Sequence, residues 1–176
     1  MTLDPTPIPG CVRLVPTWHE DERGGFARTW DGGEFERLGL NAGVLQCSVS
    51  RNTHRGTLRG MHYQAAPHEE AKLVRCTRGA VYDVCLDLRP DSATFRQWHG
   101  ETLTAENGVA LYVPEGCAHG FLTLEDATEV FYMISAPYAP DAGRGVRWDD
   151  PAFGIEWPAE VRVIHPRDAA YPLADQ

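Results

Sequence analysis

Short apolar runs recur along this chain, and glycine, proline, asparagine and aspartate residues interrupt them. The runs include CVRLVPTW, VLQCSVS, KLVRCTRGAVYDVCLDLR, GETLT, VALYVPEG, EVFYMI and VRVI. Many short runs separated by turn residues are typical of an all-β sandwich or barrel, and not of alternating strands and helices. The pattern therefore predicts an all-β fold with few short helices.

The segment VYDVCLDL, residues 81–88, alternates with a period of two. One face carries apolar side chains and the other carries polar ones: Tyr82, Val84, Leu86 and Leu88 against Asp83, Cys85 and Asp87. A period of two predicts a strand with one apolar and one polar face. We interpret the two aspartates as a solvated strand face, with Asp83 pointing into a pocket as the alternative.

Helical signals are few. The best is DGGEFERLGL, residues 31–40, because Asp31 is a good N-cap and glycine-rich sequence follows the segment. A single helical turn is predicted at 149–154. The sequence has no internal repeat or linker, so residues 1–176 form one predicted domain, with an irregular tail from about residue 165.

Composition limits the classes of partner. The chain has 176 residues, 43% of them apolar, and 25 acidic against 16 basic side chains give a net charge of -9. A field of this sign repels phosphate backbones, so nucleic acid is not an expected partner. An anionic ligand must then be bound by local cations. Lys72 is the only lysine beside fifteen arginines, which marks it as a residue of interest.

The five cysteines are odd in number, widely spaced and form no CxxC pair. This fits neither a disulfide framework nor a zinc site, so we expect reduced, mostly buried thiols. The N-terminal segment has no signal-peptide pattern, and no apolar run is long enough to cross a membrane. We therefore expect a soluble, cytoplasmic protein that does not interact with membranes.

Two neighbouring segments concentrate the polar residues that carry chemistry. GTLRGMHYQAAPHEEAKLVR places six of them close together: Arg59, His62, His68, Glu69, Glu70 and Lys72. In VPEGCAHGF, Pro114, Gly116 and His119 have the spacing P-x-G-x-x-H. Together these segments resemble the two halves of a cupin-type jelly roll, in which histidines project from strands into the mouth of a small barrel.

A metal-binding cupin supplies two histidines one residue apart, and the chain has no H-x-H pair. His68 with Glu69 or Glu70 is the only substitute, so a metal-dependent cupin using His62, His68, Glu70 and His119 stays open as an alternative. The missing pair favours acid and base chemistry without a metal.

Five segments in order resemble the dTDP-4-dehydrorhamnose 3,5-epimerase family: LRGMHYQ, KLVRCTRGAVYDVCLDLR, VPEGCAHGF, FYMISAPYAP and RGVRWDDPAFGIEWP. The resemblance runs from about Pro9 to about Pro172. It implies a jelly-roll homodimer, without metal or organic cofactor, that acts on a nucleoside diphosphate 4-keto-6-deoxy sugar at C3, C5 or both.

The resemblance also implies a catalytic set. His62 would be the general base, and Asp168 would orient its ring and raise its basicity. Lys72 would face the developing enolate oxygen, where a compact ammonium concentrates charge. Tyr132 would be the acid that returns a proton to the opposite face, since inversion requires one.

The substrate contacts are implied in the same way. Arg59 and Arg23 resemble ligands of the diphosphate, for which forked guanidinium groups are well suited. The remaining contacts are assigned to the nucleoside (Phe26, Gln46 and Tyr138, the last stacking on the base) and to the sugar (His119). Structural roles are the alternatives: a strand histidine at position 62, a turn closed by His119, loop packing by Tyr138.

Two residues depart from the family pattern. Many members have a lysine directly after the catalytic tyrosine and an acidic residue at the position of Arg28, whereas this chain has Met133 and Arg28. These departures leave open the nucleotide base and whether C3, C5 or both are inverted. A single-centre epimerase of an unusual deoxysugar is thus one alternative, and a non-catalytic sugar-binding jelly roll is another.

Overall fold

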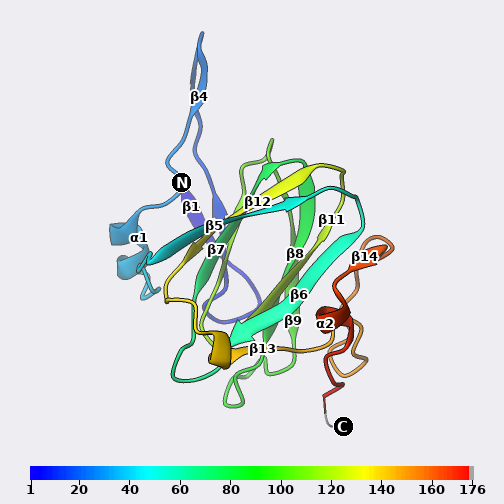
Figure 1. Cartoon of the computed structure of the whole chain (residues 1–176). Helices are drawn as coiled ribbons and strands as arrows, with labels where there is room; N and C mark the ends of the chain where they lie inside the picture. Colours follow the sequence, from blue (N-terminus) through cyan, green and yellow to red (C-terminus); the bar gives the residue numbers. More distant parts are fainter. Residues whose placement is uncertain (175–176) are drawn as a thin grey trace.

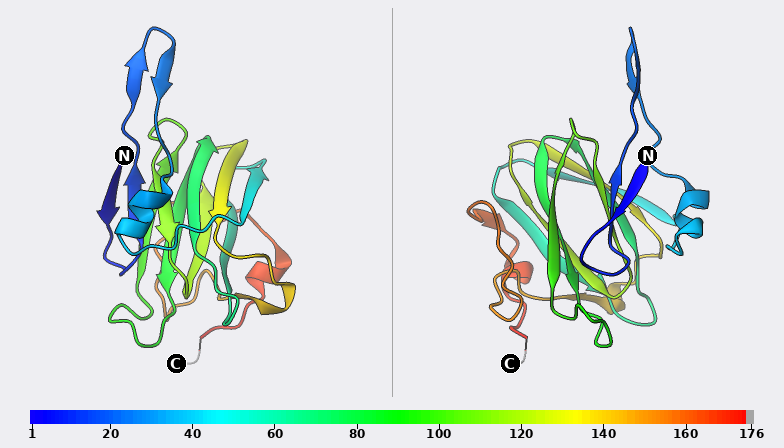
Figure 2. Two further views of the ribbon diagram at one scale, coloured as in Figure 1. Left: turned by 90° about the vertical axis from the view of Figure 1, so that its left-hand side faces the viewer. Right: turned by 180° about the vertical axis from the view of Figure 1, so that it is seen from behind.

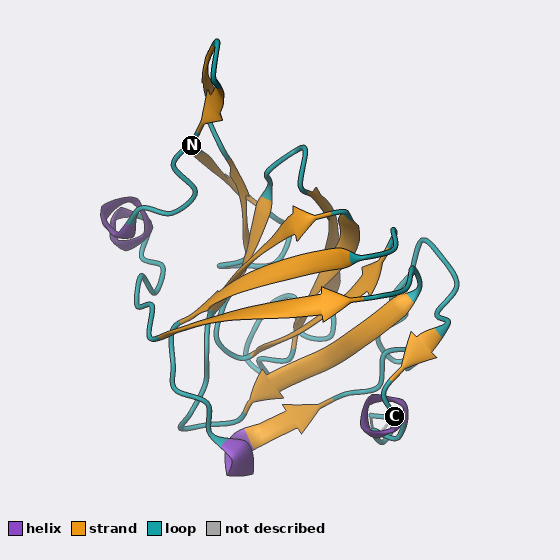
Figure 3. Ribbon diagram, turned by 45° about the horizontal axis from the view of Figure 1, so that its top comes forward, coloured by secondary structure: helices purple, strands orange, loops and turns teal. Residues whose placement is uncertain are grey.

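The computed structural model describes residues 1–174 and consists mainly of two facing β-sheets (Figures 1 and 3). The first sheet has the order β1 (Thr2–Pro5), β2 (Val12–Val15), β10 (Ala110–Val113), β7 (Lys72–Arg78), β12 (Thr128–Ile134) and β5 (Gln46–Asn52). The second has the order β13 (Gly143–Gly145), β6 (Thr57–Gln64), β11 (Cys117–Thr123), β8 (Ala80–Asp87) and β9 (Trp98–Thr104), and β14 (Val163–Ile164) pairs with β6. The all-β jelly-roll prediction is confirmed.

The two sheets face each other (Figure 2), and the main core lies between them. It is built from side chains of both: Val74, Cys76, Leu111, Val113 and Val130 from the first sheet, and Val81, Cys85, Leu103, Cys117 and Phe121 from the second. All five cysteines are free thiols, and all but Cys47 are buried.

The interpretation of Asp83 and Asp87 as a solvated strand face is wrong. Both aspartates are completely buried, because this face of β8 points between the sheets. The opposite face of β8 packs under the chain segment 146–157, in a second apolar cluster that includes Val84, Leu86 and Phe153. The period of two does correspond to a strand, but both faces of this strand are covered.

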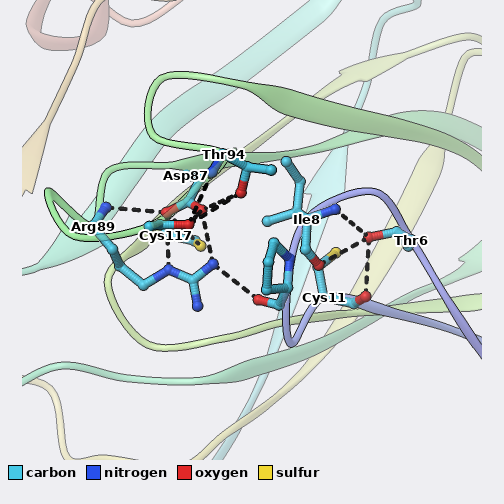
Figure 4. A network of polar contacts seen from close by, with 9 residues as sticks. Thr6, Ile8, Cys11, Asp87, Arg89, Thr94 and Cys117 are labelled. Carbon is cyan, nitrogen blue, oxygen red and sulfur yellow. Dashed lines mark hydrogen bonds and ion pairs between the residues drawn. The ribbon is translucent and has the colours of Figure 1, made fainter.

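Asp87 closes the end of the barrel through a polar network (Figure 4). Its carboxylate pairs with the guanidinium of Arg89 at 2.8 Å and accepts hydrogen bonds from the hydroxyls of Ser92 and Thr94. Burial opposes ionisation, yet these donors hold the pKa of Asp87 far below its usual value. Arg89 also donates to the carbonyl of Pro9, so the network fastens the N-terminal loop to the strand ends.

The predicted first helix is present but short. Helix α1 (Gly32–Arg37) begins after Asp31, whose side chain accepts hydrogen bonds from the amides of Gly33 and Glu34. Phe35 anchors the helix on the outer face of the first sheet, with its ring 5.5 Å from that of Tyr112. The helix ends three residues before the predicted boundary at residue 40.

The predicted helical turn at 149–154 is instead a pair of hydrogen-bonded turns around Asp150. Asp150 is buried, and its side chain accepts hydrogen bonds from the amides of Ala152 and Ala174. The sequence RWDDP therefore holds the C-terminal segment in place. That segment contains a helix that was not predicted, α2 (Pro166–Ala169).

A hairpin of β3 (His19–Asp21) and β4 (Gly24–Phe26) projects from the body of the protein (Figures 1 and 2). A 3-10 turn, η1 (Pro140–Ala142), precedes β13.

Within residues 1–174, no helix has the length and apolar character needed to span a membrane.

Candidate active site

A cavity of about 740 Å³ opens between the two sheets, and the C-terminal segment 163–168 forms one of its walls. Six of the ten site residues predicted from the sequence line it: Arg59, His62, Lys72, His119, Tyr132 and Asp168. The first sheet contributes Lys72 and Tyr132, whereas Arg59, His62 and His119 come from the second. The cavity thus collects its polar groups from two facing sheets and a terminal helix.

His62 lies on β6 and contacts Asp168 on α2. Nε2 of His62 is 2.9 Å from Oδ1 of Asp168, and the amide of Gly60 donates to Oδ2 of the same carboxylate at 3.3 Å. Gly60 has φ = 141°, and a Cβ there would lie 2.6 Å from Cα of Gly120 on β11, so only glycine fits. Strands β6 and β11 thus approach each other closely at the glycine whose amide holds Asp168.

Burial lowers the pKa of the His62 imidazole, the neighbouring Asp168 partly counteracts this, and the charge of Lys72 lowers it further. Burial also acts on Asp168, but its hydrogen bonds from His62 and Gly60 prevail and keep its pKa below the ordinary value. The pair at neutral pH is therefore a neutral imidazole and a carboxylate. Since Nε2 binds Asp168, Nδ1 is the ring nitrogen left to accept a proton.

Tyr132 approaches the cavity from β12 and packs against the main core. Burial raises the pKa of its phenol strongly, and the buried carboxylate of Asp83 adds to this effect. The phenol therefore stays protonated at neutral pH, as a proton donor must.

Lys72 is held by Glu70, whose carboxylate lies 2.9 Å from its Nζ. Both side chains are nearly buried, with 11% exposed, so the pair has limited access to solvent. The ammonium is thereby fixed at the wall of the cavity.

His119 and Asp83 form a second histidine–carboxylate pair deeper in the barrel. Nε2 of His119 lies 2.8 Å from Oδ1 of Asp83, and the rings of His119 and Tyr132 are 6.0 Å apart, edge to face. Oδ2 of Asp83 is buried and has no hydrogen-bond partner in the described chain. Asp83 therefore points into the interior of the barrel and contacts a lining residue, although it is not itself among the residues that line the cavity.

Arg59 is placed by Asn52, which accepts a 2.8 Å hydrogen bond from its Nε. Its guanidinium also donates to the carbonyl of Arg51 at 3.4 Å. These two contacts orient the guanidinium at the exposed end of the cavity.

The sequence interpretation missed the other lining residues: Ser48, Val49, Ser50, Thr57, Leu58, Phe121, Ile134 and the segment 163–167. Ser48 and Ser50 share a face of β5 with Gln46, so the alternation in QCSVSRN was an available signal. Arg167 adds a cation beside Asp168, with 3.4 Å between its Nε and the carboxylate. No periodic pattern in the sequence predicts that residues 163–167 line the cavity, because this segment contains only a two-residue strand and the start of α2.

Four predicted substrate contacts do not line the cavity. Gln46 lies beside it, opposite the lining residue Ile134, and its side-chain oxygen accepts a hydrogen bond from the amide of Tyr138. Arg23 and Phe26 lie on the projecting hairpin, where Arg23 is paired with Asp21 and Phe26 is 74% exposed. Within one chain, this hairpin does not reach the cavity.

The two departures from the family pattern also lie away from the cavity. Met133 packs in the apolar cluster on the outer face of the first sheet. Arg28 pairs with Asp31 at the start of α1, at 2.7 Å. Neither residue is among those that line the cavity.

Three of the four residues of the alternative metal site, His62 included, are paired with other side chains. Glu70 pairs with Lys72, and His119 pairs with Asp83. His68 lies on a loop where its carbonyl accepts a hydrogen bond from Gln64. In residues 1–174, no three histidine, cysteine or acidic side chains converge in a way that would hold a metal ion.

Comparison with known proteins gives consistent results. A family model described as dTDP-4-dehydrorhamnose 3,5-epimerase matches residues 5–176. The Salmonella typhimurium protein of that name is 40% identical over 178 residues, covering 100% of this chain and 97% of the relative.

Solved structures agree with the chain comparison. A dTDP-4-dehydrorhamnose 3,5-epimerase from Elizabethkingia anophelis superposes with a TM-score of 0.95 at 37% identity, covering 98% of this chain and 96% of the other. A 3'-monoepimerase from Streptomyces bikiniensis, solved with dTDP-quinovose, gives 0.89 at 36% identity, covering 96% and 86%.

Proposed function

Because this chain belongs to the dTDP-4-dehydrorhamnose 3,5-epimerase family, we propose that it inverts C3, C5 or both of a nucleoside diphosphate 4-keto-6-deoxyhexose. The names of the relatives refer to dTDP sugars, which makes thymidine the proposed nucleoside. The reaction needs no redox step, because the C4 ketone acidifies the hydrogens on both neighbouring carbons.

One observation carries the proposal: His62 and Tyr132 reach the same cavity from opposite sheets. Inversion requires a base on one side of the sugar ring and an acid on the other. Nδ1 of His62 takes the proton from the carbon, and the Tyr132 hydroxyl returns one to the opposite face. The lowered pKa of His62 and the raised pKa of Tyr132 match these roles at neutral pH.

The intermediate is an enolate, whose charge develops on the C4 oxygen. Lys72 supplies a cation at the cavity wall, and Glu70 keeps it in position. A cation that is already held in place and largely shielded from solvent stabilises a developing anion, because the cation does not have to move during the reaction. We assign Lys72 to this oxygen and His119 to a hydroxyl of the sugar.

The diphosphate requires local cations, since the protein as a whole carries a net charge of -9. Arg59 and Arg167 line the cavity and are proposed ligands, together with Arg23 on the projecting hairpin of a second copy of the chain. Gln46 and Tyr138, which lie next to each other beside the cavity, are assigned to the nucleoside.

We also propose a homodimer. Strands β1 and β5 are both edges of the first sheet, and within residues 1–174 the seven residues of β5 have no neighbouring strand on their outer side. Arg23 and Phe26, assigned to the substrate, lie on a hairpin that only a second copy of the chain would bring to a cavity. A light-scattering mass near the 19.5 kDa of one chain would contradict this assembly.

The cytoplasmic location stays a prediction that cell fractionation would test.

The likeness to a 3'-monoepimerase supports a second candidate, inversion at C3 alone. The cavity groups described above serve either outcome, because the same base and acid act on both carbons.

The deciding experiment is incubation with dTDP-4-keto-6-deoxyglucose in heavy water, followed by NMR of C3 and C5. Deuterium at both carbons with inverted configuration supports the 3,5-epimerase, and deuterium with inversion at C3 alone supports the single-centre enzyme. A sample without protein corrects for spontaneous exchange. Absence of enzyme-dependent exchange at either carbon would contradict the proposed function.

A further inference from the structure

The tail residue Tyr171 lies against His62 but does not line the cavity. The two ring centroids are 6.2 Å apart with an interplanar angle of 72°, an edge-to-face arrangement within the usual range for interacting aromatic rings. Tyr171 therefore contacts the proposed base, but it is not one of the residues that would surround a substrate in the cavity.

The sheet leaves a space for this ring. Gly145 on β13 is the register partner of His62 on β6, and a Cβ at Gly145 would lie 2.2 Å from the ring carbons of Tyr171. The tyrosine ring thus occupies the position that any side chain opposite His62 would take. Gly145 does not have positive φ, so close contact with Tyr171, and not backbone strain, is what requires glycine here.

Tyr171 follows Asp168 by three residues in the same C-terminal segment. One short stretch of chain therefore holds His62 in two ways, by the hydrogen bond of Asp168 to Nε2 and by the packing of Tyr171 on the ring. The stretch is itself fastened by Asp150, whose carboxylate accepts a hydrogen bond from the amide of Ala174 at 2.6 Å.

We propose that Tyr171 is a positioning residue for His62: its ring, seated over Gly145, holds the imidazole in the orientation that presents Nδ1 to the cavity. The inference rests on the proposed role of His62 as the base. A hydrogen bond alone leaves a ring able to tilt about its axis, and packing on its side removes that freedom. Small misplacements of a reacting group reduce rates strongly.

A double-mutant cycle tests the proposal. Tyr171→Ala removes the ring, and Gly145→Ala displaces it, so each should lower kcat roughly 10- to 100-fold with little change in KM. In the Tyr171→Ala background, Gly145→Ala should cause little further loss, because the ring that it displaces is already absent. Additive losses would overturn the proposal.

Three variants separate ring packing from other effects. Tyr171→Phe keeps the ring and should keep kcat, and a loss as large as that of Tyr171→Ala would overturn the proposal. Tyr171→Leu fills part of the space if the alanine variant folds poorly, and it should give an intermediate kcat. Leu173→Ala, at a half-exposed position in the same tail, is the matched control and should behave as wild type.

A measurement without substrate keeps this inference distinct from the proposed function. In protein labelled with 15N-histidine, wild-type His62 should show one tautomer, with the proton on Nε2 facing Asp168. Tyr171→Ala and Gly145→Ala should move its nitrogen shifts toward a mixture of tautomers, and Tyr171→Phe should not. Unchanged shifts in both alanine variants would overturn the positioning role, whereas failure of the heavy-water experiment with wild type would contradict only the epimerase assignment.

Discussion

Nε2 of His62 lies 2.9 Å from Oδ1 of Asp168, although 106 positions separate the two residues in the chain. Strand β6 carries the histidine and the four-residue helix α2 carries the aspartate. The contact is therefore tertiary, and it exists only because the C-terminal segment returns to the edge of the cavity. The pKa of the proposed base, His62, therefore depends on the C-terminal segment being packed in this position.

Asp168→Asn should shift the pH dependence of activity. The Asp168 charge raises the pKa of His62 against the stronger effect of burial, so its removal should lower that pKa further. The unprotonated base would then persist to lower pH, and the acidic limb of kcat/KM should move to lower pH. The plateau should fall by less than the roughly 100- to 10,000-fold that a whole general base contributes. A pH profile of kcat/KM measures both effects, and a limb that moves upward would contradict the assignment.

Asp87→Ala should destabilise the fold without touching the cavity. Asp87 is fully buried and accepts hydrogen bonds from Arg89, Ser92 and Thr94, and leaving such donors without their partner costs about 1–3 kcal/mol. Urea unfolding followed by fluorescence measures the change, and Asp91→Ala, at an exposed site four residues away, is the matched control. Equal stability of the two variants would show that the network contributes little.

The same buried carboxylate predicts an effect of acid on stability. The pKa of Asp87 is lowered in the folded protein, so its contribution is present above the unfolded value of about 3.9 and is lost as the pH falls toward the folded value. Wild type should therefore lose stability below about pH 4 more steeply than Asp87→Ala. Urea midpoints measured between neutral and acidic pH would show parallel curves if the interpretation were wrong.

The sequence predicts much of the fold, because alternation and capping are local signals. The period of two in residues 81–88 and the N-cap at Asp31 correspond to β8 and α1. The solvated face assigned to Asp83 failed because a strand pattern does not indicate which face a distant segment will cover. Here the segment 146–157 covers the apolar face and leaves the aspartates inside.

The site was predictable only in part. His62 and His119 stand in recognisable strand motifs, but Asp168 came from the family resemblance and not from any periodicity. Helix α2 has four residues, which is too short for an amphipathic pattern. The contact of Tyr171 with His62 depends on a missing side chain at Gly145, and sequence alone does not reveal which ring will fill such a space.

Activity should survive chelators. Two residues of the alternative metal site are paired with other side chains, Glu70 with Lys72 and His119 with Asp83, and no three possible ligands converge within residues 1–174. Turnover should therefore be equal before and after dialysis against EDTA. Loss of activity with EDTA and recovery with one particular divalent ion would favour the metal-dependent cupin instead.

His62→Ala and Tyr132→Phe should have different consequences. Without His62, no other proposed group takes the proton, so His62→Ala should abolish both deuterium exchange and inversion. Tyr132→Phe removes only the acid of the opposite sheet, so His62 can still deprotonate the sugar and return deuterium to the original face. This variant should give exchange with little inversion, and NMR in heavy water reads both quantities in one sample. Because the raised pKa keeps Tyr132 protonated well into the alkaline range, wild type should still invert the sugar there, and its difference from Tyr132→Phe should persist. Inversion at the wild-type rate in Tyr132→Phe, or exchange in His62→Ala, would contradict the two-sided mechanism.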